Sequence, residues 1–493
     1  MCADIVVSVD WGGNRVVERL RLFLAVLAAR LIRAVNRRFH LGGGTSLPGR
    51  VALKIAPNLI ASLTGQLPRG SVVITGTNGK TTTAKLLHSI LRASGARTVY
   101  NGSGANLTSG VASALLEAAD LRGRLNADLG ILEVDENAFP TVARQAKPAA
   151  VVVTNFFRDQ LDRYGEIDHT VATVRKALTA LPPQIAIWLN ADDPLVAGLG
   201  EELAHDEGKG HDRPRIAYYG VEDESIATTG IRQVPDARYC ARCGRPVVYE
   251  RVFYGHLGWY FCGNCDYRRP EPRVYARAVE VHGREGTRLE IVLPSETSFA
   301  AELKIPGFYN VYNALAAVAA ATTLGAGVDA VEEGLGGAQS AFGRMEKLEI
   351  AGRDVVLALV KNPTGFNATI QALLADDASR HCTAMFALND RSADGEDVSW
   401  IWDVDLEALA REGSVRSIMA TGLRAEDMAV RLKYAGFAPN SIQVEKDLAR
   451  ALEAALGLAP EGGTVYVLPT YTAMLGLRQL LEEQGRVRRY WEA

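Results

Sequence analysis

Residues Val72–Thr83 read VVITGTNGKTTT, and a helix-forming segment from Ala84 to Ala93 follows them. A β-branched strand therefore leads into a glycine-punctuated loop, and the loop leads into a helix. Backbone N–H groups of such a loop and of the helix N-terminus bind polyphosphate. A lysine there reaches the β- and γ-phosphate oxygens, and the next threonine is placed for Mg²⁺. The stretch predicts an ATP site comprising Gly76, Asn78, Gly79, Lys80, Thr81 and Thr82.

The strict phosphate-loop pattern has a glycine at the position of Ile74. The alternative interpretation is a glycine-rich turn that contains a lysine by chance. We favour ATP binding, because Gly-Lys-Thr directly after a hydrophobic strand is a strong signal.

Composition sets the outer limits. The chain has 493 residues, of which 48% are hydrophobic, so it is long enough for two to four domains with real cores. Its net charge of −3 gives no reason to expect nucleic acid as a partner. Six cysteines, four of them in one short segment, indicate metal binding in a reducing compartment rather than a secreted disulfide scaffold. We therefore expect a cytoplasmic protein.

The N-terminal segment, residues 1–49, predicts a basic amphipathic helix. Its apolar run Leu22–Ala29 is too short to cross a bilayer, and arginines interrupt the sequence after it at positions 30, 33, 37 and 38. A signal peptide is disfavoured because the positive charges follow the apolar run more heavily than they precede it. Packing against the rest of the protein is the favoured role, and contact with an anionic membrane surface is the alternative.

After the phosphate loop, near-continuous apolar strands at 128–134, 149–154 and 185–190 alternate with helices. This order predicts a parallel sheet covered on both faces, with ligands at the carboxyl ends of its strands. Polar residues lie at or just past such ends: Asn101, Glu133, Asp135, Asn155 and Asn190. Glu133 is the candidate to complete Mg²⁺ coordination with Thr81. The alternative for Glu133 is a capping or salt-bridged acid.

Residues 236–272 break this pattern with two CxxC pairs, Cys240/Cys243 and Cys262/Cys265, separated by eighteen residues. Four thiolates at this spacing predict a tetrahedral Zn²⁺ site with no position open to water, so the zinc is expected to be structural. Aromatic residues between the pairs suggest an inserted ribbon of short hairpins. Nucleic-acid recognition and two redox pairs are less favoured alternatives.

A second alternation of strands and helices follows the ribbon. Its strands are expected at 355–360, 383–388, 417–421 and 464–468, which predicts a second doubly wound α/β domain. We therefore expect a central ATP-binding domain over residues 50–340, interrupted by the ribbon, and a C-terminal domain over residues 341–493.

Four ordered motifs of this chain resemble those of the Mur ligase family: Thr75–Thr82, Asn190–Asp193, the asparagine-rich turn after Tyr309, and Gly343–Glu346. Mur ligases use ATP to convert a carboxylate into an acyl phosphate, which an amine then attacks. The resemblance implies that Asn313 and Arg344 close over ATP. It also implies that Arg344 stabilises charge on the transferring phosphoryl group; the alternative is a surface arginine in a linker.

The chain departs from the family pattern at three places. Gln160 stands where the family has a histidine that helps to hold a second Mg²⁺, and Tyr309 replaces another histidine. Val174–Lys176 offers no clear equivalent of the carbamylated lysine found in many members. Catalysis with a second Mg²⁺ and catalysis without one therefore both stay open as interpretations.

The C-terminal motifs resemble those of the MurT branch of the family. They are Lys361–Asn367, Asn389–Asp390, Asp397–Asp403 and Pro469–Met474. The resemblance implies amidation of the D-glutamate α-carboxylate of the peptidoglycan precursor lipid II, with ammonia supplied by a GatD-type glutaminase subunit. It further implies that an aspartate of this chain completes the partner's Cys-His pair. We assign that role to Asp403 with Asp397 in reserve, and the alternative for Asp403 is an acid that caps the helix near Leu406.

The chain's own cysteines agree with the need for a partner. A glutaminase requires a nucleophilic cysteine on a sharp turn near a histidine. Outside the ribbon the chain has only Cys2 and Cys382, and Cys382 lies in an apolar strand without flanking glycines. Two other functions remain as alternatives: a Mur- or folylpolyglutamate-like ligase that adds an amino acid, and an ATP-gated binding module built around the ribbon.

Overall fold

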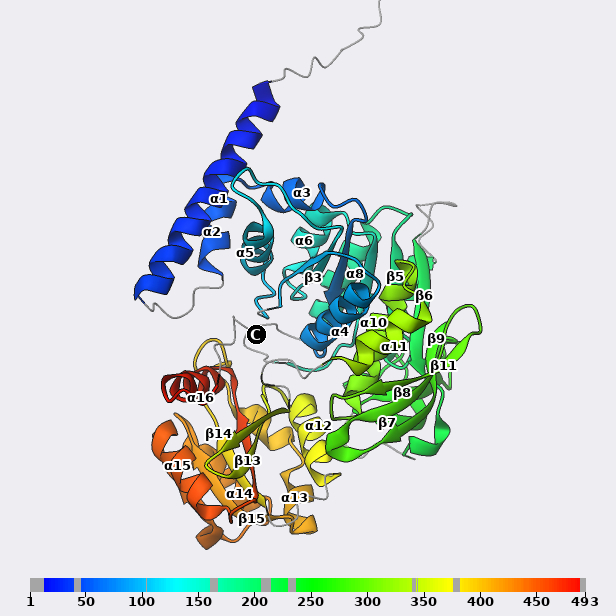
Figure 1. Ribbon diagram of the computed structural model, residues 1–493. Coiled ribbons are helices and arrows are strands. Elements are labelled where there is room, and N and C mark those ends of the chain that lie inside the picture. Colours follow the sequence, from blue (N-terminus) through cyan, green and yellow to red (C-terminus); the bar gives the residue numbers. More distant parts are fainter. Residues whose placement is uncertain are drawn as a thin grey trace, which may run out of the picture.

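The computed structural model describes residues 13–39, 46–102, 104–159, 167–204, 214–228, 236–338, 343, 345–375 and 382–487. Figure 1 shows a central α/β part, a C-terminal α/β part below it, and a long N-terminal helix along the outer edge. Among the helices described, none is long and apolar enough to cross a membrane.

The central sheet has nine strands in the order β11-β10-β9-β6-β5-β4-β1-β3-β2. All pairs from β9 to β2 are parallel, and the pairs β9–β10 and β10–β11 are antiparallel. The strands are β1 (Ser71–Thr75), β2 (Thr98–Tyr100), β3 (Leu129–Glu133), β4 (Ala150–Val153), β5 (Ala186–Asn190), β6 (Arg215–Val221), β9 (Val274–Val281), β10 (Thr287–Val292) and β11 (Ser298–Leu303).

Helices cover both faces of this sheet, as the apolar strands predict. Along β1, Val72 and Ile74 belong to one core cluster, whereas Val73 belongs to the cluster on the opposite face. The first cluster includes α4 (Lys80–Ala93), α10 (Tyr309–Thr323) and α11 (Val328–Gly336). The second includes α1 (Gly13–Phe39), α2 (Leu47–Ile55), α3 (Leu59–Thr64), α5 (Thr108–Ala118), α6 (Phe139–Ala146), α8 (Ile167–Thr179) and α9 (Pro194–Ala204).

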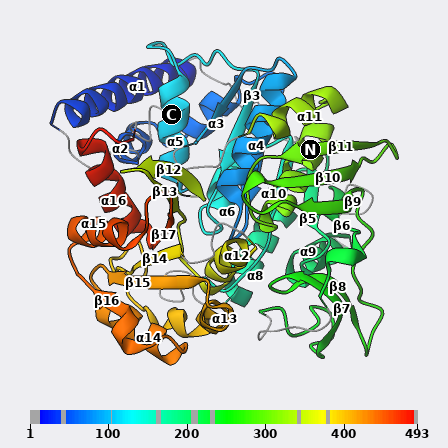
Figure 2. The same cartoon turned by 60° about the horizontal axis from the view of Figure 1, so that its bottom comes forward.

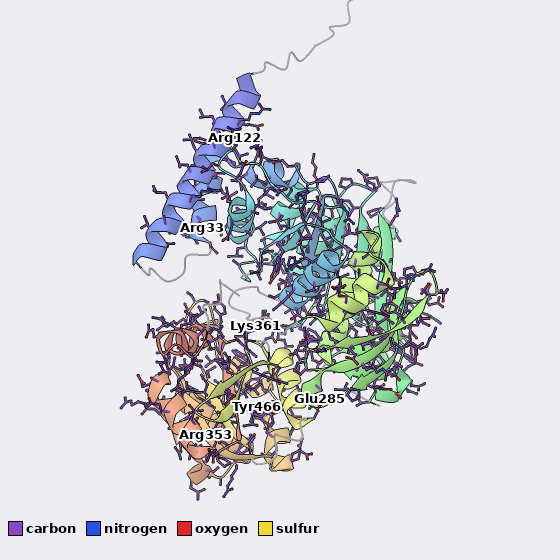
Figure 3. The ribbon with its side chains drawn as sticks, viewed as in Figure 1. Arg33, Arg122, Glu285, Arg353, Lys361 and Tyr466 are labelled. Carbon is purple, nitrogen blue, oxygen red and sulfur yellow. The ribbon has the colours of Figure 1, made fainter. Side chains whose placement is uncertain are left out.

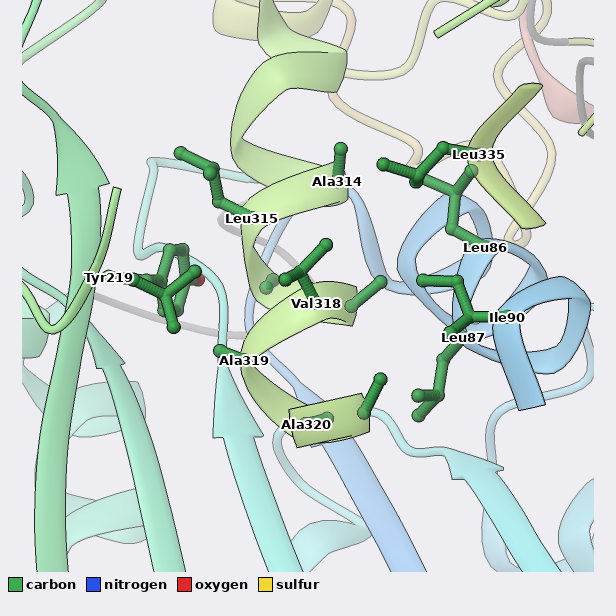
Figure 4. Packing of buried hydrophobic residues seen from close by; sticks show 14 of the residues in the cluster. Leu86, Leu87, Ile90, Tyr219, Ala314, Leu315, Val318, Ala319, Ala320 and Leu335 are labelled. Carbon is green, nitrogen blue, oxygen red and sulfur yellow. The ribbon is translucent and has the colours of Figure 1, made fainter. Parts of the chain in front are cut away.

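Helix α10 occupies the middle of the first face. It is rich in alanine, and every residue from Asn310 to Ala321 is buried. Figure 4 shows Ala314, Leu315 and Val318 of α10 between the sheet and α4. Small side chains allow this close approach of backbone elements, so the alanine run is a packing feature of the core.

Two features of the central part differ from the sequence-based expectation. The sheet continues through the antiparallel strands β9, β10 and β11, which were not predicted; the side chains of β11 alternate between exposed and buried. The boundary expected at residue 49 falls inside α2, which contacts both α1 and α5. The N-terminal helix thus packs on the central part, the favoured of its two expected roles.

The C-terminal part has a six-stranded sheet in the order β12-β13-β17-β14-β15-β16, parallel except for the β12–β13 hairpin. Separate core clusters lie on its two faces, which confirms the doubly wound domain. Its strands are β12 (Glu346–Ile350), β13 (Arg353–Leu357), β14 (Cys382–Ala387), β15 (Val415–Thr421), β16 (Ile442–Val444) and β17 (Thr464–Pro469). Its helices are α12 (Pro363–Leu374), α13 (Leu406–Glu412), α14 (Ala425–Tyr434), α15 (Leu448–Leu458) and α16 (Tyr471–Glu483).

The inserted ribbon is a single two-stranded hairpin, and both cysteine pairs lie at its open end, one just before its first strand and the other at the end of its second. Strands β7 (Val247–Tyr254) and β8 (Leu257–Cys262) pair antiparallel to each other and to no other strand of the described chain. Figure 2 shows the hairpin beside α9, at the edge of the central part.

Candidate functional site

The loop between β1 and α4 has a conformation that requires glycine at two positions. Gly76 and Gly79 have φ angles of 120° and 87°, which L side chains rarely adopt. A Cβ on Gly79 would lie 2.0 Å from Oδ1 of Asn313. The loop is also tied to the end of β4, because Asn78 N donates to Asn155 Oδ1 at 2.9 Å. The result is a fixed backbone cradle at the carboxyl edge of the sheet.

Lys80 is buried beneath this loop. Its Nζ donates to the backbone oxygens of Gly76 and Thr77 and lies 3.1 Å from Oε2 of Glu136. Burial alone lowers the pKa of Lys80, but the carboxylates of Glu136, Asp135 and Glu133 outweigh it, so the pKa is raised. Lys80 is therefore a permanent cation, held where an incoming polyphosphate would meet it.

Thr81 and Glu133 are in direct contact. Thr81 Oγ1 donates to Glu133 Oε1 at 2.9 Å, and Glu133 is 2% exposed at the end of β3. Asn101 fixes the backbone there, since its side chain accepts from Glu133 N at 2.8 Å and donates to Glu133 O at 2.7 Å. A hydroxyl and a carboxylate oxygen brought together beside a phosphate loop are ligands that suit Mg²⁺.

A small cavity of about 30 Å³ lies between the phosphate loop and the C-terminal part. The central part contributes Asn78, Gly79, Thr81, Thr82 and Asn313 to its wall, so these predicted residues face one space. The remaining wall comes from Tyr254 of the ribbon hairpin, Tyr309, and residues just before β12, just after β13 and in α12: Gly343, Met345, Ala358, Leu359, Gly365, Ala368 and Thr369.

Two contacts join the central and C-terminal parts. Asn362 Nδ2 donates to Asn78 Oδ1 at 3.2 Å, and Lys361 Nζ donates to Asp159 Oδ2 at 2.8 Å. Figure 3 shows Lys361 between the two α/β parts. Asn362 is also the N-cap of α12, because its Oδ1 accepts from Gly365 N. The C-terminal part therefore presents a capped helix start directly to the phosphate loop.

Arg344 lies outside the described residues, as does Gln160. The motif around Arg344 is held on both sides. Leu359 N donates to Gly343 O at 2.8 Å, and Glu346 pairs with Arg478 of α16.

The four ribbon cysteines converge on one point. Their sulfurs lie within 4.8 Å of one another, with 3.6 Å between Cys240 and Cys265 and 3.5 Å between Cys243 and Cys262. The backbone N–H groups of Arg242 and Asn264 point at sulfur in each knuckle. Each of these close sulfur pairs joins one cysteine from each CxxC motif. This arrangement fits a single tetrahedral Zn²⁺ and argues against two separate redox pairs.

The ribbon is anchored through Asp192, the buried third residue of the Asn190–Asp193 motif. Asp192 accepts from Arg269 of the ribbon at 2.6 Å, from the Tyr312 hydroxyl of α10 at 2.8 Å, and from Val221 N at 2.9 Å. At the tip of the hairpin, the Tyr254 hydroxyl donates to Thr364 O of α12. The ribbon thus braces the central sheet, α10 and the C-terminal part.

Asp403 ends a short 3₁₀ turn and its side chain is 59% exposed. The expected alternative, a helix cap, is wrong for this residue, because Asp405 caps α13 by accepting from Ala408 N. Asp397 instead accepts from Ser399 N at 2.8 Å within its own loop. Beside Asp403, the exposed rings of Trp402 and Tyr434 lie 5.7 Å apart. An exposed acid flanked by exposed aromatic rings suits contact with another protein.

Three residues make contacts at the site that the sequence did not predict. Glu136, which pairs with Lys80, directly follows Asp135, and no sequence pattern distinguishes it from the neighbouring acids. Asp159 and Asn362 meet residues more than 200 positions away, so no local pattern marks their pairing.

Known proteins with this architecture identify the class. A family model of the Mur ligase middle domain matches residues 74–238, and one of the MurT ligase C-terminal region matches residues 359–474. The structure of MurF from Acinetobacter baumannii has a TM-score of 0.63 at 21% identity and covers 88% of this chain and 80% of that chain. A pseudomurein peptide ligase type C from Methanothermus fervidus has a TM-score of 0.61 at 24% identity, covering 85% and 79%. The fold and the phosphate-loop site define an ATP-dependent ligase of the Mur type, a family that uses ATP and Mg²⁺.

Two relatives that match nearly the whole chain identify the branch of the family. The chain is 33% identical over 465 residues to the lipid II isoglutaminyl synthase (glutamine-hydrolyzing) subunit MurT of Staphylococcus aureus (strain COL), covering 94% of this chain and 97% of that protein. It is also 33% identical over 475 residues to the protein of the same name from Streptococcus pneumoniae (strain ATCC BAA-255 / R6), covering 95% and 99%. The chain belongs to the MurT family.

Proposed function

We propose that this chain is the synthetase subunit that converts the D-glutamate residue of lipid II into D-isoglutamine. The observation that carries the proposal is the contact of Asn362 with Asn78, which joins the MurT-type C-terminal part to the phosphate loop. The relatives are named as subunits of a glutamine-hydrolyzing lipid II isoglutaminyl synthase. From these names we infer that the substrate is lipid II and that glutamine is the nitrogen source.

The reaction has two steps. An oxygen of the α-carboxylate attacks the γ-phosphorus of ATP, the bond to the β,γ-bridging oxygen breaks, and ADP leaves with that electron pair. Ammonia then attacks the acyl phosphate carbon, inorganic phosphate leaves, and the nitrogen loses a proton to give the amide.

We assign the phosphates of ATP to Gly76, Asn78, Gly79, Lys80, Thr81 and Thr82, with Asn313 and Arg344 closing over them. The protonated Lys80 exchanges Glu136 for phosphate oxygens, which are stronger acceptors of its charge. Thr81 and Glu133 would hold Mg²⁺, which neutralises phosphate charge when bound. Fixed cations and N–H donors stabilise the transferring phosphoryl group because they need no reorganisation during the reaction.

We further propose a GatD-type glutaminase subunit as partner, with Asp403 orienting the histidine of the partner's Cys-His pair. The exposure of Asp403 and the aromatic rings beside it support this role. The four-cysteine cluster would hold one structural Zn²⁺. The central and C-terminal parts would work in the cytoplasm, where ATP is available and thiols stay reduced.

The test is ATP-dependent amidation of purified lipid II, followed by mass spectrometry. The chain is supplied first with ammonium and then with the glutaminase and glutamine. Exchange of –OH for –NH₂ lowers the product mass by about one unit, and Lys80→Ala should abolish it. Addition of an amino acid instead of ammonia would overturn the proposal in favour of an ordinary ligase.

A further inference from the structure

The outer face of α1 is apolar, exposed and unaccounted for by the ATP site. Its inner face packs through Ala25, Val26 and Ala29, which are at most 2% exposed. Its outer face carries large hydrophobic side chains that are 43–66% exposed, and we refer to them as the outer stripe: Val17, Leu20, Leu24, Leu27, Leu31 and Val35.

The outer stripe is a continuous feature of the helix. Its members follow one another at intervals of three or four residues, so they lie along one side of α1. Together with the neighbouring Phe23 they make up seven of the 19 exposed large hydrophobic residues in the described chain, on a helix of 27 residues. In Figures 1 and 2, α1 lies along the outside of the molecule with α2 and α5 on one side of it. The stripe therefore faces away from the protein.

The positive charge of α1 indicates which kind of surface the outer stripe would contact. The helix contains seven arginines and one glutamate, although the whole chain has a net charge of −3. At about 100° per residue, exposed Arg21 lies at one margin of the stripe and exposed Arg19 lies beside Phe23 at the other. Arg30 is on the same side as Arg19, but its guanidinium donates to Ala119 O of the protein. A helix with an apolar face between basic margins lies in the interface of an anionic bilayer.

The same charges argue against pairing with a second copy. The stripe has the spacing of a two-stranded coiled coil, in which acidic residues beside the seam pair with basic residues of the other helix. Each copy of α1 offers only Glu18 against its seven arginines. Two such helices side by side would repel each other.

We propose that the outer stripe of α1 and its marginal arginines dock this chain on the surface of an anionic phospholipid membrane. This inference deepens the proposed function, because a lipid-linked substrate is held at such a surface. Arg30 and Arg33 also donate to the carbonyl oxygens of Ala119 and Ser113. The docked helix is therefore joined firmly to α5 and to the domain that binds ATP.

The test is flotation of the full chain with vesicles of phosphatidylcholine alone or mixed with phosphatidylglycerol. Binding to the mixed vesicles should exceed binding to the neutral ones at least tenfold and fall with added salt. A variant with Leu20, Leu24, Leu27 and Leu31 each changed to Gln should lose this binding. The matched control changes four exposed residues elsewhere to Gln and should bind as before: Val248, Val281, Leu423 and Val444.

Three further readouts separate the outcomes. The stripe variant should keep its melting temperature, since the changed side chains are exposed, and should still amidate a soluble muropeptide. It should lose activity only on vesicle-embedded lipid II. Equal vesicle binding by the stripe variant and the unaltered chain would overturn the proposal. So would loss of a homodimer, or of glutaminase binding, in the stripe variant without a change in flotation. Vesicle binding without amidation of either substrate would instead overturn the proposed function, whereas the proposal that α1 docks on a membrane would remain supported.

Discussion

The guanidinium of Arg158 lies 3.9 Å from the carboxylate of Asp403, and these two residues belong to the central and C-terminal parts. Both side chains are about half exposed, and Arg158 is also 3.7 Å from Asp236. Exposed ion pairs of this kind contribute little free energy, typically about 0–1 kcal/mol. Because this ion pair is weak, the carboxylate of Asp403 is available for the role proposed above, which is to orient a histidine of a partner subunit.

The first prediction concerns Asp403. Asp403→Asn should reduce glutamine-driven amidation about 100-fold or more, because the glutaminase histidine loses the acid that orients it. Ammonium-driven amidation should be unchanged, since the ATP site is untouched. Rates with the two nitrogen sources, measured side by side, check this. Asp397→Asn is the matched control, and an equal loss with ammonium would contradict the role of Asp403.

The second prediction concerns Glu133. Glu133→Gln should raise the Mg²⁺ concentration needed for half-maximal amidation about tenfold or more, because a neutral amide is a poorer Mg²⁺ ligand than a carboxylate. A Mg²⁺ titration at saturating ATP measures the shift. Glu302→Gln, at an exposed position of β11, should behave as the unaltered chain. An unchanged titration curve for Glu133→Gln would leave Glu133 as a structural acid.

The third prediction separates the two roles of Asn362. Serine is also a good N-cap, so Asn362→Ser should keep α12 capped while losing the donor to Asn78. We expect the KM for ATP to rise about tenfold with the melting temperature nearly unchanged. Steady-state kinetics and thermal unfolding on the same preparation test this. A large fall in melting temperature with an unaltered KM would show a purely structural contact.

The fourth prediction concerns zinc. The purified chain should contain one zinc per molecule, and Cys243→Ser should lose most of it and unfold at a lower temperature. Cys382→Ser should retain the metal, because Cys382 is buried in β14 away from the cluster. Metal analysis by mass spectrometry gives the stoichiometry. Full zinc content in Cys243→Ser would contradict a site built from all four thiolates.

The fifth prediction is a dependence of stability on pH. Burial, followed by the charges of Arg92 and Lys85, lowers the pKa of His88 from 6.5 to about 4. The unfolded chain therefore takes up this proton at a higher pH than the folded chain, and protonation favours unfolding. The contribution of His88 should reduce the free energy of unfolding as the pH falls from about 6.5 to 4. Denaturant titrations of the unaltered chain and His88→Gln should diverge over this range, with the flatter curve for the variant.

The sequence predicts local structure well because local signals determine it. The phosphate loop, the buried parallel strands and the cysteine pairs each lie within a few tens of residues and carry their own periodicity or spacing. The contact between Asn78 and Asn362 spans 284 positions. It depends on how two folded surfaces fit together, and neither residue marks its partner in the sequence. The antiparallel edge of β9–β11 was not predicted, because the alternating pattern of β11 does not specify which strands pair with one another.

Helix α10 has a consequence for the order in which the chain is made. It contacts α4 and five strands of the central sheet, yet it follows the ribbon in the sequence. A nascent chain that has emerged from the ribosome only as far as residue 300 therefore exposes the apolar sheet face that α10 later covers. The ribbon cysteines emerge before that face is closed. Supply of zinc and protection from aggregation would thus be needed during the same interval of synthesis.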